Sequence, residues 1–257
     1  MRPVYLCGFM GCGKSHIGRM LSKECTAVFI DLDDTLWDFT ASSAVALRQV
    51  YDTYCIERWS GAYDVFRDLY KAKNKELWEL YHYGKIEKTF LVEERFRFPL
   101  LKIGYDGGDI DRFAADINTE YLRYLALQPN IVDGAIELLE FIRSRYGRVG
   151  VLSNGFKGTQ QQKLISGGLD KYVDLLVLSD EVGVTKPLPG IFEYATNTWN
   201  VEPGKTLMIG DNYDADVCGA HNAGWRTIYF NRKSTDFATP AADATVDRLI
   251  DIVGLLK

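Results

Sequence analysis

Two aspartates that directly follow an apolar run are the residues best suited to chemistry. Residues 27–30 are rich in strand formers and show no polar alternation, which is typical of a parallel strand buried on both faces. Asp31 and Asp33 come next, and side chains two apart on a strand point the same way. Carboxylates held so close repel unless a cation joins them. The spacing predicts a Mg²⁺ site with Asp31 as nucleophile and Asp33 as general acid and base; the alternative is a capped strand-to-helix turn.

The elements around these aspartates follow an α/β rhythm. Strands are predicted at 149–152, 175–178, 206–209 and 226–230, and helices at 135–144, 191–199 and 249–256. Strands separated by helices imply parallel βαβ units, whose carboxyl ends share one edge of the sheet. Ser153 and Asn154, then Asp211 and Asp216, follow two of these strands, and Lys186 lies in a loop between them. We therefore expect these side chains to converge on the aspartate pair.

Residues 40–127 interrupt this rhythm with helical spacing and almost no strand signals. The segment is rich in aromatic residues, which are predicted to form mostly the core of a helical bundle, although some could stack on a flat ligand. Gly61, Gly84 and residues 104–108 are the expected helix breaks.

Composition excludes several classes of protein. With 30 Lys plus Arg against 35 Asp plus Glu, the chain offers no charge for nucleic-acid backbone binding, and a small-molecule partner is expected. The five cysteines show no metal-ligand spacing, which favours free thiols in a reducing cytosol. No apolar run approaches the ~20 residues of a membrane span, and no signal peptide is found, so a cytoplasmic protein without a membrane partner is predicted.

The first residues carry a second motif. Residues 8–15 match GxxxxGK[ST], in which the backbone around Gly13, with Lys14 and Ser15, would cradle a phosphate. Residues 1–34 resemble the opening of shikimate kinases, and the resemblance then stops. A working P-loop kinase is one alternative; a peripheral strand and helix, or a poorly docked extension over residues 1–25, is the preferred interpretation.

The later motifs resemble another family over residues 26–257. Asp31-x-Asp33-x-Thr35, Ser153, Lys186-Pro187 and Gly210-Asp211-x-x-x-x-Asp216 stand in the order and spacing of haloacid-dehalogenase-like phosphohydrolases. The resemblance implies a doubly wound, parallel-sheet (Rossmann-like) α/β core formed by residues 26–38 and 128–257, with an inserted helical cap formed by residues 39–127.

The same resemblance implies the roles of the site residues. Asp31 would form an aspartyl-phosphate, and Asp33 would protonate the leaving oxygen and then activate water. Mg²⁺ would be held by Asp31, the backbone carbonyl of Asp33, and Asp211, with Asp216 as an auxiliary residue. Ser153 and Lys186 would bind the phosphoryl oxygens, with Asn154 as an auxiliary residue beside them.

A narrower resemblance is to the pyrimidine 5′-nucleotidase branch. It rests on residues 152–156, Gln160-Gln161, 168–169, 172–174 and 179–187, and on Leu77-Trp78, residues 84–86 and Arg95-Phe96 in the inserted segment. It implies a nucleoside monophosphate as the small phosphorylated substrate. A sugar-phosphate phosphatase, a phosphomutase and a non-catalytic phosphate-binding module are the alternatives.

Overall fold

A computed structural model describes residues 25–234 and 236–257, so the P-loop-like motif with Gly13, Lys14 and Ser15 lies outside the described residues. The chain divides into two compact units. Phe39–Pro129 form a helical unit, and the described residues up to Asp38 together with Asn130–Lys257 form a core unit.

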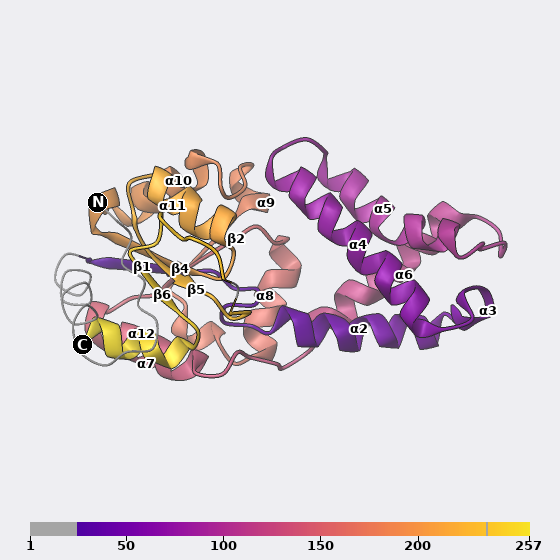
Figure 1. Cartoon of the computed structure of the whole chain (residues 1–257), viewed down its shortest axis with the longest axis horizontal. Helices are drawn as coiled ribbons and strands as arrows, with labels where there is room; N and C mark the ends of the chain where they lie inside the picture. Colours follow the sequence, from indigo (N-terminus) through magenta and orange to yellow (C-terminus); the bar gives the residue numbers. More distant parts are fainter. Residues whose placement is uncertain (1–24, 235) are drawn as a thin grey trace. The chain divides into compact units, whose positions relative to one another are not determined.

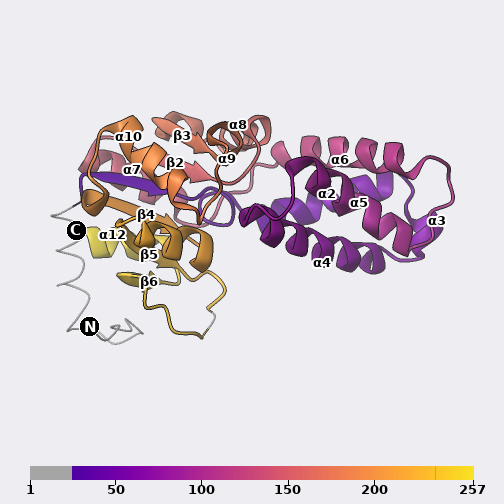
Figure 2. The same cartoon turned by 90° about the horizontal axis from the view of Figure 1, so that it is seen from above.

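The core unit contains one parallel sheet with the strand order β3-β2-β1-β4-β5-β6 (Figures 1 and 2). Ile30 of β1 pairs with Val151 of β2 on one side and with Ile209 of β4 on the other. The strand that leads into Asp31 is therefore flanked by the strands that end at Ser153 and Gly210, the order that the family resemblance implies. The strands are β1 Ala27–Ile30, β2 Gly150–Ser153, β3 Leu175–Leu178, β4 Thr206–Gly210, β5 Arg226–Phe230 and β6 Ala244–Val246.

Helices cover both faces of this sheet, with α10 and α11 on one face and α7 and α12 on the other (Figure 1). An apolar cluster that includes Phe29, Met208, Phe192 and Trp225 fills the space under α10 and α11. The helical segments of the core unit are α7 Ala135–Tyr146, α8 Lys157–Ser166, η1 Asp170–Tyr172, α9 Ser179–Val182, α10 Pro189–Trp199, η2 Pro203–Lys205, the π-helical turn η3 Tyr213–Cys218, α11 Gly219–Asn222 and α12 Leu249–Leu256.

The helical unit has an aromatic core, as predicted. Tyr70 stacks on Phe96 at 4.8 Å between ring centroids, and Tyr121 meets Tyr70 edge-on at 5.5 Å. The aromatic prediction does not hold for Tyr83 and Phe90, which are exposed. Gly61, Gly84 and Gly104 follow the ends of helices and Gly108 precedes α6, all four with positive φ, so the predicted helix breaks are confirmed. The helices are α2 Phe39–Thr53, α3 Glu57–Ser60, α4 Tyr63–His82, α5 Lys88–Lys102 and α6 Ile110–Ala126.

The chain leaves and re-enters the core unit along a short two-stranded ribbon, residues 36–38 against residues 130–132. Trp37 and Ile131 form an antiparallel bridge. The Asp38 N–H donates to the Asn130 carbonyl at 3.0 Å, and the Val132 N–H donates to the Leu36 carbonyl at 2.9 Å. These bonds satisfy backbone groups at the junction of the two units.

The sequence did not predict strand β6, helix α8 or the short helical segments η1, α9 and η2 of the core unit. Strand β6 has only three residues, which is too short for a periodic signal. Helix α8 has the sequence KGTQQQKLIS, with a glycine in its first turn and few apolar positions. Strands β1, β3 and β5 and helix α12 have the predicted bounds, and β2 lies one residue later than predicted.

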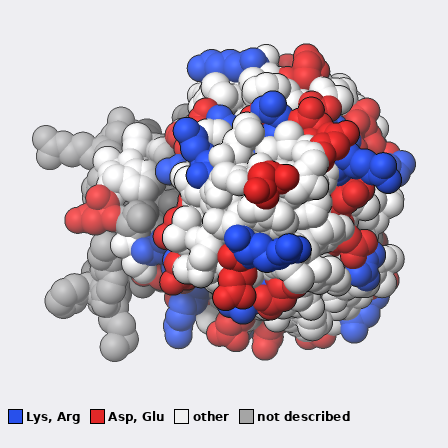
Figure 3. Space-filling model, turned by 90° about the vertical axis from the view of Figure 1, so that its right-hand side faces the viewer, with Lys and Arg blue, Asp and Glu red and all other residues white. Residues whose placement is uncertain are grey.

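The surface carries charged side chains of both signs. On the face shown in Figure 3, Lys and Arg side chains are interspersed with Asp and Glu. Over the described part of the chain, we find no helix with the length and apolar character needed to cross a membrane.

Candidate active site

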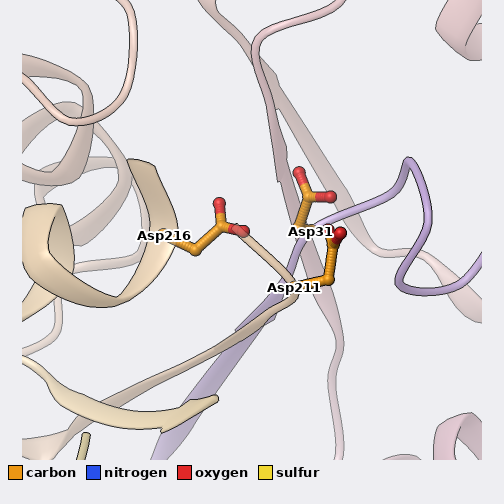
Figure 4. Close-up of side chains that lie close together, drawn as sticks. All are labelled: Asp31, Asp211 and Asp216. Atoms are coloured by element: carbon orange, nitrogen blue, oxygen red, sulfur yellow. The ribbon is translucent and has the colours of Figure 1, made fainter. Parts of the chain in front are cut away.

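Three carboxylates meet beyond the carboxyl ends of β1 and β4. Asp31 follows β1, Asp211 follows β4, and Asp216 comes from the π-helical turn η3. One oxygen of each lies within 4.8 Å of the others (Figure 4). The predicted pair of Asp31 and Asp211 is thus brought together, and Asp216 belongs to the same cluster.

Gly210 makes room for this cluster. A Cβ atom at position 210 would lie 2.2 Å from Asp216 Oδ2, closer than any real contact. The same Oδ2 accepts a hydrogen bond from the Asn212 N–H at 3.0 Å. The absence of a side chain at 210 therefore lets the Asp216 carboxylate approach the end of β4.

Lys186 lies buried among the carboxylates. Its Nζ donates to Asp31 Oδ1 at 2.6 Å, to Asp216 Oδ1 at 2.6 Å and to the Leu152 carbonyl at 2.7 Å. These contacts engage all three ammonium hydrogens. The sequence predicted Lys186 as a ligand of phosphoryl oxygens, and such an oxygen would have to replace one of these acceptors.

The single positive charge of Lys186 does not neutralise the three carboxylates. Burial raises the pKa of Asp31 well above its ordinary value; Lys186 lowers it, but Asp216 and Asp211 raise it further. Burial, and then Asp216, raise the pKa of Asp211 to about 7. Burial alone would lower the pKa of Lys186, but its contacts with Asp216 and Asp31 raise it above the usual value, so the ammonium stays charged.

Asn154 holds the loop that carries Lys186. Its Nδ2 donates to the Lys186 carbonyl at 2.9 Å, and the Lys186 N–H donates to its Oδ1 at 2.8 Å. Ser153, the last residue of β2, accepts a hydrogen bond from the Gly155 N–H at 3.2 Å. Asn154 binds the backbone of Lys186, and Ser153 follows Leu152, whose carbonyl accepts a hydrogen bond from Lys186. Both residues therefore lie beside the carboxylate cluster, as the sequence predicted.

The Asp33 side chain is not part of the carboxylate cluster and is bound by two side chains of helix α8. Lys163 Nζ donates to its Oδ1 at 2.7 Å, and Gln160 Nε2 donates to its Oδ2 at 2.8 Å. Lys163 was not predicted as a site residue, and Gln160 entered only as part of a family resemblance. No sequence signal marks them, because α8 has too few apolar positions to show which of its faces is buried.

The turn after Asp33 is fixed by two further contacts. The Thr35 hydroxyl donates to Asp211 Oδ1 at 3.2 Å and accepts from the Asp211 N–H at 3.0 Å. Arg232, after β5, donates to Asp34 Oδ1 at 3.2 Å and also pairs with Asp38. Asp34 has a φ of 58°, a left-handed conformation that Asp tolerates better than most residues.

This fold and arrangement of residues match a known family. A family model described as a haloacid dehalogenase-like hydrolase matches residues 25–224. The chain belongs to this family, and the resemblance stated from the motifs is confirmed. The match begins at residue 25 and gives no support to the resemblance of residues 1–34 to shikimate kinases.

Several known proteins are similar to the chain. Pyrimidine 5′-nucleotidase YjjG of Escherichia coli (strain K12) is 34% identical over 205 residues, which cover 79% of this chain and 85% of the relative. Glyceraldehyde 3-phosphate phosphatase of Methanothermobacter thermautotrophicus is 31% identical, with 82% and 87% covered. The magnesium-bound crystal structure of the HAD-hydrolase YfnB from Bacillus subtilis superimposes with a TM-score of 0.81 at 26% identity, covering 91% of this chain and 99% of that chain. The prediction of an enzyme, a phosphatase of this family, is confirmed.

Proposed function

We propose that the protein is a Mg²⁺-dependent 5′-nucleotidase that hydrolyses pyrimidine (deoxy)nucleoside monophosphates through an aspartyl-phosphate. The observation that carries the proposal is the buried cluster of Asp31, Lys186, Asp211 and Asp216 beside a separately held Asp33. The 34% sequence identity with a pyrimidine 5′-nucleotidase supports the substrate class. The helical segment predicted at 39–127 would serve as the cap domain of this enzyme, and 26–38 with 128–257 as its catalytic core.

The donor set fits Mg²⁺. Three carboxylates with oxygens within 4.8 Å of one another offer the hard oxygen ligands that Mg²⁺ takes, and burial with mutual repulsion raises the pKa values of Asp31 and Asp211. Asp31, Asp211 and the backbone carbonyl of Asp33 would hold the ion, with Asp216 as an auxiliary residue. When bound, Mg²⁺ supplies positive charge that offsets the charge on the phosphoryl oxygens.

The residues of the chain divide the reaction between them. The Asp31 carboxylate attacks phosphorus and forms an acyl phosphate as the bond to the leaving oxygen breaks. Asp33 gives its proton to that oxygen and then takes a proton from the water that hydrolyses the aspartyl-phosphate. Ser153 and Lys186 bind the phosphoryl oxygens that carry the remaining charge, assisted by Asn154, which fixes the Lys186 backbone.

A phosphate-release screen over nucleoside monophosphates and sugar phosphates tests the substrate class. We expect Mg²⁺-dependent release from UMP, dUMP and dTMP that EDTA abolishes. A preference for sugar phosphates would favour the second candidate, a sugar-phosphate phosphatase, which the identity with glyceraldehyde 3-phosphate phosphatase supports.

Two variants test which motif does the chemistry. Asp31→Asn removes the nucleophile and should lower kcat by at least ~10³-fold, since a covalent step cannot be replaced by binding alone. Lys14→Ala, in the P-loop-like motif, should leave kcat unchanged. Loss of turnover in Lys14→Ala, with full activity in Asp31→Asn, would instead assign the reaction to the P-loop.

A further inference from the structure

Helix α8 supplies a donor to each oxygen of the Asp33 carboxylate. Lys163 contacts Oδ1 and Gln160 contacts Oδ2. Neither residue belongs to the four motifs of the phosphohydrolase family, and Gln160 is part only of the narrower nucleotidase resemblance. The two side chains are three residues apart on α8 and therefore lie on the same face of the helix. A carboxylate with both oxygens bound to different side chains can keep only one orientation.

The Lys163 ammonium is buried and contacts both a carboxylate and an aromatic ring. It is 3% exposed, although a buried ammonium is costly unless it is paired. Its Nζ also lies 4.7 Å from the centre of the Trp37 ring, whose side chain is fully buried. The indole and the carboxylate together hold the ammonium against the turn that follows β1.

Gln160 joins Asp33 to Ser153. Its Nε2 lies 2.6 Å from Ser153 Oγ and 2.8 Å from Asp33 Oδ2, and the residue is fully buried. The Oε1 atom of Gln160 has no hydrogen-bond partner among the described residues. The amide is thus oriented by the two oxygens that it serves as donor, because the flipped amide would set its own oxygen against a carboxylate.

The backbone leaves room for this amide. A Cβ atom at Gly155 would lie 2.3 Å from the Gln160 side chain. Gly155 has no positive φ, so an alanine there is compatible with the backbone and would act by displacing Gln160. Glycine at position 155 therefore leaves the space that the Gln160 side chain occupies.

We propose that Gln160 and Lys163 are positioning residues that hold the Asp33 carboxyl group for proton transfer to the leaving oxygen. The inference rests on the proposed function, in which Asp33 is the general acid. Proton transfer requires the acid within hydrogen-bond reach of the leaving oxygen, and small misplacements of a catalytic group slow the reaction strongly. Lys163 and Gln160 act through Asp33 and do not themselves contact the reacting atoms.

The leaving group gives a readout that a structural role would not produce. The ribose oxygen of UMP must be protonated as it departs, whereas p-nitrophenolate is stable without a proton. Loss of positioning should therefore lower kcat/KM for UMP much more than kcat/KM for p-nitrophenyl phosphate. A variant that merely disturbs the fold would lower both values by the same factor.

Lys163→Met and Gln160→Ala are the test variants. Each should lower kcat/KM for UMP by about 10²-fold, the lower range for general acid catalysis, with little change for p-nitrophenyl phosphate. Lys157→Met and Gln161→Ala are the matched controls, since both positions are exposed on the same helix. Both controls should behave as the wild type with either substrate.

Two additional variants keep the test decisive. Gly155→Ala displaces the Gln160 side chain without removing it and should show the same selective loss with UMP. It replaces Gln160→Ala in the test if that variant fails to fold. In an Asp33→Asn background, Lys163→Met should cause no additional loss with UMP, because both changes act on one group. Equal losses with the two substrates, or additive losses in the double variant, would overturn the inference. Absence of phosphatase activity in the wild type would overturn the proposed function itself, and the two failures are therefore distinguishable.

Discussion

The core unit contains buried ion pairs that join residues far apart in the sequence. In the core unit, Lys186 pairs with Asp31 across 155 positions of sequence, and Lys163 pairs with Asp33 across 130 positions. Both lysines are buried. Such pairs exist only when the whole sheet has formed, because β1, β2 and the loop after β3 must first be brought together.

In the helical unit the comparable pairs are local and exposed. Arg48 pairs with Asp52 four residues away, and Arg123 pairs with Glu120 three residues away. These contacts need only one turn of one helix, and water screens them. These pairs of the core unit therefore depend on the tertiary fold, whereas those of the helical unit lie on a solvated surface.

The largest effect is expected for Lys186→Met. The substitution leaves Asp31 and Asp216 buried without their cation, and it should reduce the free energy of unfolding of the metal-free protein by about 3–5 kcal/mol. Urea denaturation measures the change. Lys205→Met is the matched control, since that lysine forms an exposed pair with Glu202 and its loss should leave the urea midpoint unchanged. Equal midpoints for the two variants would show that the buried pairs contribute no more than the exposed one.

The second prediction concerns pH and Mg²⁺. The pKa of Asp211 is about 7 in the fold against an ordinary 3.8, so the folded metal-free protein retains a proton that the unfolded chain releases. This contribution to stability is fully present below pH 3.8 and is lost as the pH rises through about 7. Mg²⁺ binds the deprotonated form, so it should raise Tm more at about pH 8 than at about pH 5.5. The Mg²⁺ concentration for half-maximal activity should rise up to ~10-fold for each pH unit below 7. A Mg²⁺ requirement that is constant over this range would contradict the buried carboxylate cluster as the metal site.

The smallest expected effect lies in the helical unit. Asp109 caps α6 by accepting hydrogen bonds from the N–H groups of Asp111 and Arg112, both at 3.1 Å. Asp109→Ala should reduce the free energy of unfolding by about 1 kcal/mol, measured by urea denaturation. Arg123→Ala, which breaks an exposed pair on the same helix, is the control and should leave the midpoint unchanged. A larger effect of Arg123→Ala than of Asp109→Ala would contradict the view that this surface charge is mainly solvated.

The sequence was informative where a feature depends on strands and on fixed spacings. The apolar run before Asp31 predicted a central buried strand, and Ser153, Lys186 and Asp211 were placed correctly because parallel strands share a carboxyl edge. The contacts of Lys163 could not be predicted. They depend on the rotation of α8 about its axis, and α8 has too few apolar residues to reveal which face is buried. The sequence predicted that Asp216 lies near Asp31 and Asp211, but it did not reveal the π-helical turn or the steric need for glycine at position 210 that bring Asp216 there.

The ribbon formed by residues 36–38 and 130–132 has a consequence for how this protein could have been assembled. Because the two crossing segments are already hydrogen-bonded to each other, the ends of any insert at this position start close together. Closing a short loop there costs little conformational entropy, and a long insert costs only slightly more, since the cost grows with the logarithm of length. Segments of very different length can therefore be inserted at this junction without altering the register of the sheet.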